Sequence, residues 1–313
     1  MLEPEMEIVV LGGGVSAERA VSLASAQAVF DALQRGGRKA RFVDLTVAAL
    51  PEAIDVKRDV IFPVLHGTFG EDGGIQTLLE ASGFSYVGSD ADSSRLCMDK
   101  GSAKAIAAEA GVPVLESLYF DRLNIPRWAA VCEQLGATEV VLKPRCEGSS
   151  VGLHLIASPE EWERVGADLG PGEWMVERRL RGHDVTVGIL EGAALGVVEI
   201  FPGGDGVYDY ERKYSKGETR YRAPAQIDQG LERAMKTAAE AVFKGCGCRD
   251  FARIDFYLEA DGSYWFLEIN TIPGLTSTSL LPKSAGCLGL DFANLVDRMI
   301  EPACYRLQSF RQR

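Results

Sequence analysis

The runs FARIDFYL (Phe251–Leu258) and YWFLEI (Tyr264–Ile269) decide the fold of the C-terminal part of this chain. Both are short and rich in aromatic and β-branched residues, which favours β-strands. The Asp261-Gly262 step between them is typical of a hairpin turn, so we expect the two strands to pair antiparallel. The sequence therefore predicts a β-hairpin over residues 251–269.

Charged side chains interrupt this predicted hairpin at positions where burial of an unpaired charge would be costly. Asp255 lies within the first strand and Glu268 within the second, and Asn270 follows two residues later. Oxygen ligands held on rigid strands suit Mg²⁺ that is bound together with the phosphates of a nucleotide. The alternative is a structural pair of carboxylates that Arg253 and nearby lysines neutralise.

The composition is that of a globular protein without a basic surface for nucleic acid. At 313 residues the chain suggests two or three domains. Its formal charge of −12, without any long Lys/Arg run, argues against nucleic acid as a partner. The sequence contains neither a signal peptide nor a run long enough to span a membrane, so we expect a cytoplasmic protein without a membrane partner.

The cysteines do not indicate a disulfide framework, because there are seven of them at scattered positions. Only Cys246 and Cys248 lie close together in sequence, too tightly for the usual zinc spacing and without a second pair. We therefore expect reduced thiols without a catalytic role.

The first hundred residues alternate strand and helix patterns. A buried-strand run at Ile8–Leu11 ends in three glycines, and apolar residues then recur at helical spacing from Val21 until Gly36-Gly37. Further strand runs lie at residues 40–45, 60–66 and 84–87. This order predicts a doubly wound parallel sheet whose ligands gather at the carboxyl ends of its strands. His66 lies at one of these ends, although a packed core histidine would fit the same position.

The rest of the chain continues the mixed pattern. We expect helices over residues 98–110 and 231–243, and strands over residues 139–143, 151–156, 174–177, 185–190 and 195–200.

The loop after the first strand, Gly12-Gly13-Gly14-Val15-Ser16-Ala17, leaves two interpretations open. It fits G-x-G-x-x-A between a strand and a helix, and Asp44 ends the second strand, which is the pattern of an NAD-dependent oxidoreductase. Against this, Glu18 lies in the first helical turn, where a carboxylate would compete with a pyrophosphate and favour an ammonium group. Favourable placement at the helix N-terminus explains Glu18 equally well.

A second glycine-rich loop, EGSSVG at Glu147–Gly152, is a stronger candidate for phosphate binding. It follows a strand that ends in Lys143, and it is rich in backbone N–H and hydroxyl donors. The lysine would meet phosphate oxygens as a point charge while the loop folds over them. The Walker order G-x-x-x-x-G-K-[ST] is absent, and a mobile surface hairpin is the alternative.

Several motifs, each modest alone, become specific when they are taken in order. They are GGVSAERAV (13–21), LHG (65–67), GEDG (70–73), MDK (98–100), KPRCEGSSVG (143–152), YDYERKY (208–214), RID (253–255) and EINTIPGLTSTSL (268–280). In these motifs the chain resembles the ATP-grasp ligases and, among them, the D-alanine–D-alanine ligases of the bacterial cell-wall pathway. The resemblance covers essentially the whole chain.

The resemblance implies an α/β protein of three-domain ATP-grasp architecture with an N-terminal doubly wound parallel sheet. The implied units are residues 1–97, an N-terminal α/β domain; residues 98–180, the central subdomain; and residues 181–313, the C-terminal subdomain. ATP would lie between the second and third units, and the amino acids would lie where all three units meet.

The same resemblance implies roles in the nucleotide site. Two Mg²⁺ or Mn²⁺ ions that bridge the phosphates of ATP would be held by Asp255, Glu268 and Asn270. Phosphate oxygens would be contacted by Lys100, Lys143 and Lys213. Glu177 would mark the adenine-binding hinge, and Asp184 would contact the ribose, although the family more often has Glu at the latter position.

Further roles are implied for the amino-acid sites. Glu18 would bind the ammonium of the first D-alanine, His66 would lie near its carboxylate, and Arg253 would stabilise the tetrahedral oxyanion. The carboxylate of the second D-alanine would be bound by Gly274, Ser279 and Leu280. Ser149 and Tyr214 would link to Glu18 and so close the loops over the site.

The implied activity is ATP-dependent ligation of two D-alanine molecules through an acyl phosphate, with small molecules as the only substrates and a homodimer as the assembly. Tyr214 favours an amine acceptor, since a neutral tyrosine does not repel an ammonium group. The alternatives are a ligase for D-lactate or D-serine, an NAD-dependent oxidoreductase, and a nucleotide-responsive binding protein without catalysis. The intact set of Arg253, Asp255, Glu268 and Asn270 argues against the last of these.

Overall fold

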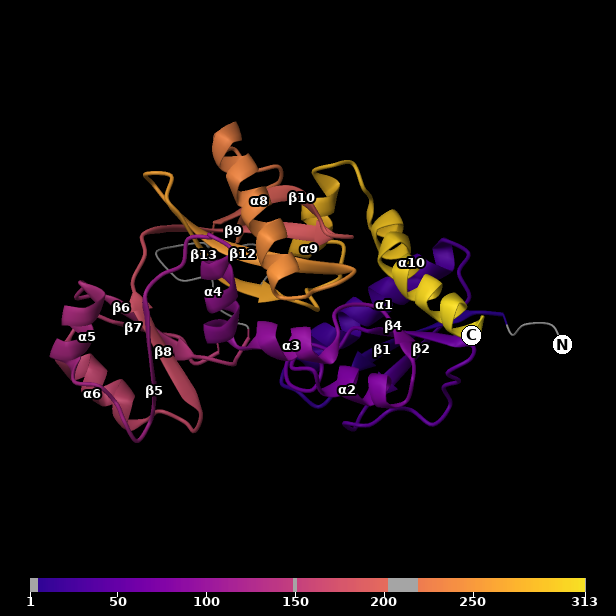
Figure 1. The fold of residues 1–313 in the computed structure, drawn as a ribbon, viewed down its shortest axis with the longest axis horizontal. Coiled ribbons are helices and arrows are strands. Elements are labelled where there is room, and N and C mark those ends of the chain that lie inside the picture. The colour runs from indigo at the N-terminus through magenta and orange to yellow at the C-terminus, as the bar shows by residue number, and fades with distance from the viewer. Residues whose placement is uncertain (1–4, 149–150, 202–218, 313) are drawn as a thin grey trace.

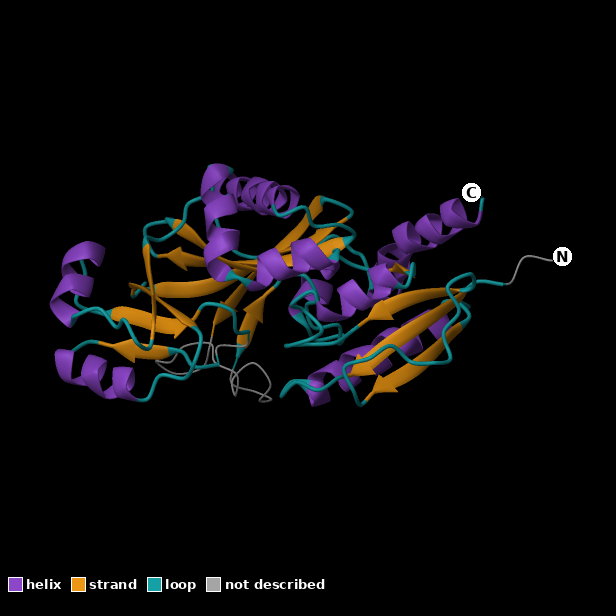
Figure 2. Ribbon diagram, turned by 60° about the horizontal axis from the view of Figure 1, so that its bottom comes forward, coloured by secondary structure: helices purple, strands orange, loops and turns teal. Residues whose placement is uncertain are grey.

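The computed structural model describes residues 5–148, 151–201 and 219–312. Within these residues the chain forms a parallel sheet and two antiparallel sheets, arranged side by side along the molecule (Figure 1). The first sheet lies at the right of the figure, the second at the left, and the third between and above them. Helices cover the upper face of this third sheet (Figure 2).

The first sheet is parallel, as predicted, with the strand order β2-β1-β3-β4. Its strands are β1 (Glu7–Gly13), β2 (Ala40–Leu45), β3 (Asp59–Pro63) and β4 (Ser85–Tyr86). The helices that follow them in sequence are α1 (Arg19–Arg35), α2 (Gly74–Ala81) and α3 (Ala91–Met98). Helix α10 (Phe292–Arg311) joins this unit from the far end of the chain and packs on α1, β3 and β4 (Figure 1).

The second sheet is antiparallel in the order β5-β8-β6-β7, with α5 (Trp128–Leu135) and α6 (Pro159–Ala167) in the same unit. Its strands are β5 (Ser117–Asp121), β6 (Val140–Pro144), β7 (His154–Ile156) and β8 (Glu173–Arg178). The Gly111-Val112-Pro113 step in the sequence indicates a strand entry without giving the strand's bounds, and β5 begins four residues later. The glycine-rich loop after Lys143 connects the antiparallel neighbours β6 and β7, so its position between two strands is confirmed.

The third sheet has the order β11-β10-β9-β12-β13 and contains the predicted hairpin. Its strands are β9 (Gly182–Leu190), β10 (Ala193–Phe201), β11 (Arg220–Arg222), β12 (Phe251–Glu259) and β13 (Tyr264–Asn270). Strands β12 and β13 pair antiparallel, with Asp255 opposite Glu268. Its helices are α4 (Lys100–Glu109), α8 (Gln229–Gly245) and α9 (Leu280–Gly286).

Strand β12 shows why the hairpin has one apolar and one charged face. Alternate residues Ile254, Phe256 and Leu258 are buried in a core shared with α4 and α8. The residues between them, including Arg253 and Asp255, are only partly buried and project from the opposite face. This alternation places the charged residues away from the core.

Phe251, at the start of β12, connects the third sheet with the first. Its side chain is fully buried in a core that includes Phe62 of β3 and residues of α10, and the two phenylalanine rings lie 6.2 Å apart. The first and third sheets therefore share a hydrophobic core. The division of the chain after residues 97 and 180 stays a prediction.

We expect Phe251→Ala to lower the free energy of unfolding by about 3–5 kcal/mol, because the truncation leaves a cavity in this shared core. Phe310→Ala is the matched control, since Phe310 is 55% exposed and its truncation should change stability by less than about 0.5 kcal/mol. Urea denaturation followed by circular dichroism measures both. Equal effects would contradict a core shared by the two sheets.

Candidate active site

A large cavity of about 1360 Å³ lies where the three sheets meet. Every predicted site residue within the described part of the chain lines it: Glu18, His66, Lys100, Lys143, Glu177, Asp184, Arg253, Asp255, Glu268, Asn270, Gly274, Ser279 and Leu280. The other predicted site residues, Ser149, Lys213 and Tyr214, lie outside the described residues. Residues far apart in sequence are therefore brought to one space.

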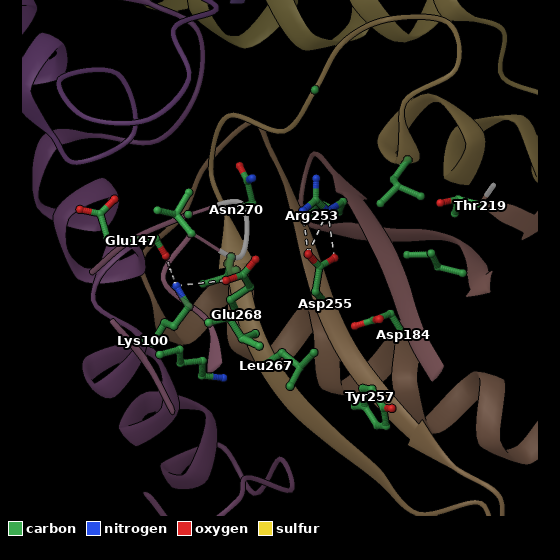
Figure 3. A pocket seen from close by; sticks show the side chains of 18 of the residues that line it. Lys100, Glu147, Asp184, Thr219, Arg253, Asp255, Tyr257, Leu267, Glu268 and Asn270 are labelled. Carbon is green, nitrogen blue, oxygen red and sulfur yellow. Dashed lines mark hydrogen bonds and ion pairs between the residues drawn. The ribbon is translucent and has the colours of Figure 1, made fainter. Parts of the chain in front are cut away.

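The charged face of the β12–β13 hairpin points into this cavity (Figure 3). Arg253 Nη2 lies 2.6 Å from Asp255 Oδ2, and Arg253 Nε donates to Asp255 Oδ1 at 2.9 Å. Thr186 on the neighbouring strand β9 donates its hydroxyl to Asp255 Oδ1 at 2.6 Å. On β13, Glu268 Oε2 lies 3.2 Å from Lys100 Nζ. Each carboxylate thus has a cation beside it.

Asp255, Glu268 and Asn270 are suitable ligands for a divalent cation. The register places Asp255 opposite Glu268 and Arg253 opposite Asn270, so their side chains project from one face of the hairpin. Both carboxylates stay accessible, with 15% and 25% of their side chains exposed. In the described part of the chain no three His, Cys, Asp or Glu side chains gather as a metal site, so other oxygens must complete the coordination. Mg²⁺, which binds through few carboxylates together with substrate phosphates, fits such a set.

Lys100 and Lys143 line the side of the cavity toward the second sheet. Lys143 Nζ, at the end of β6, lies 2.8 Å from Glu177 Oε2. Lys104, one helical turn after Lys100 on α4, also pairs with Glu177. Burial, and then the nearby Lys100, lowers the pKa of Lys143 to about 8, while burial and Lys143 lower the pKa of Lys104 to about 6. A phosphate would relieve this repulsion. Lys104 was not predicted, although its spacing of four from Lys100 puts both on one helix face.

Glu177 and Asp184 lie on either side of the segment that connects the second sheet to the third. Strand β8 ends at Arg178 and β9 begins at Gly182, so both acids lie close to this connection. The Glu177 carboxylate is already engaged by lysines and by the Ser117 hydroxyl, which donates to it at 2.8 Å. An adenine contact at this hinge would therefore come from the backbone beside Glu177 rather than from its carboxylate.

Glu18 and His66 meet at the edge of the first sheet. The Ser16 hydroxyl donates to the His66 carbonyl at 2.6 Å and accepts from the Glu18 backbone N–H at 3.2 Å. Gly67 has a φ of +73°, and a Cβ there would lie 3.0 Å from Glu18 Oε2, so a side chain would crowd the carboxylate. Burial lowers the pKa of His66 to about 4, so its ring is neutral near pH 7.

The first glycine loop is organised in a way that disfavours a dinucleotide. The N–H groups of Gly13 and Gly14 donate to Ser22 Oγ and to the Leu45 carbonyl at 2.9 and 2.7 Å. Arg19 Nη2 lies 2.7 Å from Asp44 Oδ2, the carboxylate that a ribose would need. The loop is closed by its own contacts, which weakens the interpretation as an NAD site.

The loop before α9 also lines the cavity. Ser279 precedes the first residue of α9, Leu280, and its Oγ accepts from the Thr276 N–H at 3.1 Å. The Thr276 and Ser279 hydroxyls are 2.8 Å apart. A Cβ at Gly274 would lie 3.0 Å from Ser279 Oγ, so glycine leaves room beside this hydroxyl. Hydroxyl and N–H donors at this point suit a carboxylate.

Glu71, to which the sequence analysis assigned no role, also lines the cavity. Its Oε2 accepts a hydrogen bond from the Gly67 N–H at 2.5 Å. Gly67 also lies next to the Glu18 carboxylate. Burial, and then the nearby Glu18, raises the pKa of Glu71 to about 8. The signal in the sequence was the GEDG motif itself, but only the fold shows that its glutamate lies beside Glu18.

The comparisons with known proteins agree over the length of the chain. The family model described as D-ala D-ala ligase N-terminus matches residues 45–89, and the one described as D-ala D-ala ligase C-terminus matches residues 106–301. A D-alanine–D-alanine ligase of Anaeromyxobacter dehalogenans (strain 2CP-C) is 40% identical, covering 96% of this chain and 97% of that protein. That of Aquifex aeolicus (strain VF5) is also 40% identical, covering 94% and 100%.

Solved structures show the same likeness. The VanG D-Ala:D-Ser ligase from Enterococcus faecalis matches with a TM-score of 0.82 and 30% identity, covering 96% of this chain and 99% of that chain. A D-alanine–D-alanine ligase from Bacillus anthracis complexed with ATP matches with a TM-score of 0.82 and 28% identity, covering 98% and 99%.

The raised pKa of Glu71 predicts a specific dependence of stability on pH. The folded protein, with a pKa of about 8, holds a proton that the unfolded chain releases near its ordinary value of 4.5. Stability from this group is therefore complete below that value and falls as the pH rises toward 8. The Glu71→Gln side chain cannot ionise. The melting temperature of this variant, relative to that of the natural chain, should therefore rise between pH 4.5 and about pH 8, as measured by differential scanning calorimetry. Glu301→Gln, at an exposed site on α10, is the control, and parallel curves for Glu71→Gln and the natural chain would contradict a protonated Glu71.

Proposed function

The chain belongs to the D-alanine–D-alanine ligase family, and from that premise we propose that its cavity joins two molecules of D-alanine into D-alanyl-D-alanine with ATP. One observation carries this proposal: a phosphate-binding end, with Lys100, Lys143 and the carboxylates of the hairpin, shares one cavity with an amino-acid end at Glu18. A ligase that activates a carboxylate with ATP needs both ends within reach of each other.

The first step is activation of a carboxylate, because a carboxylate alone is a poor acyl donor to an amine. The donor D-alanine would place its ammonium at Glu18 and its carboxylate toward Arg253. Transfer of the γ-phosphoryl group from ATP to this carboxylate gives an acyl phosphate and ADP. Lys100 and Lys143 would stabilise the charge on the transferring phosphate oxygens.

The second step forms the peptide bond. The amine of the second D-alanine attacks the acyl carbon, and phosphate leaves. Arg253, held in place by its two contacts with Asp255, would face the oxyanion of the tetrahedral intermediate. Donors at Gly274, Ser279 and Leu280 would orient the acceptor through its carboxylate. Water must be excluded because it hydrolyses an acyl phosphate.

We also propose that Asp255, Glu268 and Asn270 hold two Mg²⁺ or Mn²⁺ ions beside the phosphates. When bound, these ions would neutralise charge on the phosphate oxygens as Lewis acids. The accessible carboxylates on one face of the hairpin support this assignment. Lys100, which lies beside Glu268, would then turn to phosphate oxygens.

D-Alanine is the favoured acceptor over D-serine and D-lactate. The curated relatives named D-alanine–D-alanine ligase are about 40% identical to this chain over nearly its full length. The predicted role of Tyr214 agrees with this choice, since a neutral phenol near the acceptor does not repel an ammonium group.

The proposed setting is the bacterial cytoplasm, where D-alanyl-D-alanine enters peptidoglycan precursors. No helix among the described residues has the length and apolar character needed to cross a membrane. We also propose that two copies of the chain assemble as a homodimer.

The activity is tested by incubating the full chain with Mg-ATP and D-alanine, L-alanine, D-serine or D-lactate, and identifying the products by mass. We expect ADP and phosphate release with D-alanine, and D-alanyl-D-alanine as the main product even when D-lactate is present in excess. Substantial D-alanyl-D-lactate or D-alanyl-D-serine at neutral pH would overturn the acceptor assignment. Absence of any ATP-dependent product would overturn the proposed function.

Asp255→Asn and Glu268→Gln should each lower kcat at least about 100-fold at saturating Mg²⁺, because each removes a charge that balances the phosphates in the transition state. Circular dichroism should show that both variants stay folded. Asp261→Asn is the matched control, since Asp261 lies exposed in the turn of the same hairpin and should keep its kcat. Near-normal kcat in either of the first two variants would show that these carboxylates are structural.

A further inference from the structure

Three cysteines from distant parts of the sequence lie together at the cavity, which Cys97 lines. Cys97 is next to the last residue of α3, while Cys246 and Cys248 follow α8. All three are reduced and buried. The Sγ atoms of Cys97 and Cys248 are 3.5 Å apart, and Cys246 is also within hydrogen-bonding reach of Cys97. This arrangement was not expected from the sequence, in which Cys97 and Cys248 are 151 residues apart.

The two backbone segments that carry these thiols are already held against each other. The Ser93 hydroxyl on α3 donates to the Gly247 carbonyl at 2.9 Å. Arg249 Nε donates to the Gly88 carbonyl at 2.7 Å, and the Gly88 N–H donates to Asp250 Oδ2 at 2.8 Å. A bond between Cys97 and Cys248 would therefore form between segments that tertiary contacts have already placed side by side.

The surroundings make Cys248 the more reactive thiol of the pair. Its hydrogen bonds with the side chains of Cys97 and Ser89 lower the pKa of Cys248 despite burial. The hydrogen bonds of Cys97 with Cys246 and with Cys248 raise the pKa of Cys97, so Cys97 keeps its proton. Cys248 is also the most exposed of the three, at 9% against 4% for Cys97 and 3% for Cys246. Thiolate character and access favour reaction at Cys248.

We propose that Cys97 and Cys248 are a site of reversible oxidation, at which a hydroperoxide converts the two thiols into a disulfide. The Cys248 thiolate attacks one peroxide oxygen; an S–O bond forms, the O–O bond breaks, and the leaving oxygen departs as water or an alcohol after taking a proton. The Cys97 sulfur, on losing its proton, attacks the resulting sulfenic sulfur. The S–S bond forms as the S–O bond breaks, and water leaves. Two electrons pass from the two thiols to the peroxide.

The bond would act on the phosphate-binding side of the cavity. A disulfide brings its sulfurs to about 2.05 Å, so the end of α3 and the loop before β12 must approach each other. Cys97 lies three residues before Lys100, the start of α4, whose ammonium contacts Glu268. Displacement of a catalytic group by about 1 Å can lower a rate by about 100-fold. Oxidation is therefore expected to reduce turnover; this consequence, unlike the bond, rests on the proposed function.

Chemical mapping of the full chain tests the bond without reference to activity. Protein treated with hydrogen peroxide is alkylated and digested, and cross-linked peptides are identified by mass before and after reduction with dithiothreitol. We expect a Cys97–Cys248 linkage and a loss of two thiols that dithiothreitol restores. Cys97→Ser and Cys248→Ser should each abolish the linkage, whereas Cys132→Ser, a thiol on α5 in another unit, should retain it. Retention of all thiols, or a linkage of Cys97 to Cys246, would overturn the proposal.

Activity is then compared in the oxidised and re-reduced states, with the exposed Cys146 replaced by Ser throughout so that its oxidation cannot cause the loss. We expect turnover to fall about tenfold or more on oxidation and to recover with dithiothreitol. Unchanged turnover in protein with the mapped bond would reject the effect on Lys100 while leaving the bond established. A reduced protein without ligase activity would reject the proposed function instead, because the mapping does not depend on catalysis.

Discussion

The pairing of Asp255 with Glu268 across the β12–β13 hairpin is the constraint on which the rest of the structure depends. Side chains directly opposite each other in an antiparallel pair project from the same face, and the next residues project from the other. The face that carries Ile254 and Phe256 is consequently apolar and packs beneath α4 and α8. A slip of one residue would bury both carboxylates and expose the core residues. The hydrophobic effect thus fixes the positions of the charged groups in the cavity, although it does not act on them directly.

The charge balance of the cavity follows from the same arrangement. A chain with a formal charge of −12 must gather cations locally if it is to bind polyphosphates. Lys100, Lys143 and Arg253 supply them, and without substrate each has a carboxylate beside it: Glu268, Glu177 and Asp255. These pairs avoid the large penalty of an uncompensated buried charge. Under the proposed function, phosphates and divalent cations would replace the protein's own counter-charges, so binding would exchange one set of ion pairs for another.

The sequence was sufficient wherever the decisive contacts are local. Alternating residues and the Asp261-Gly262 turn predicted the hairpin, and the strand–helix order predicted the parallel sheet. The entry to strand β5 was expected at Gly111-Val112-Pro113, but its bounds were not, because only one of its five residues is buried and its alternation is weak. Glu71 and Lys104 were missed for another reason: what distinguishes them is burial beside a like charge, Glu18 for one and Lys143 for the other. Such proximity depends on how the helices and strands pack, and it cannot be predicted from the spacing of residues in the sequence.

The proposed function gives a reason for the core that the first and third sheets share. An amino acid near pH 7 carries an ammonium and a carboxylate two bonds apart, so it must meet negative and positive groups at a fixed separation. In the proposed site Glu18, which follows the first strand of the first sheet, would supply the negative group, and Arg253 of the third sheet would supply the positive group. Phe62 and Phe251 pack between these two sheets and hold them against each other. Rigid packing at this junction would therefore hold the two charges at the spacing that one small zwitterion demands.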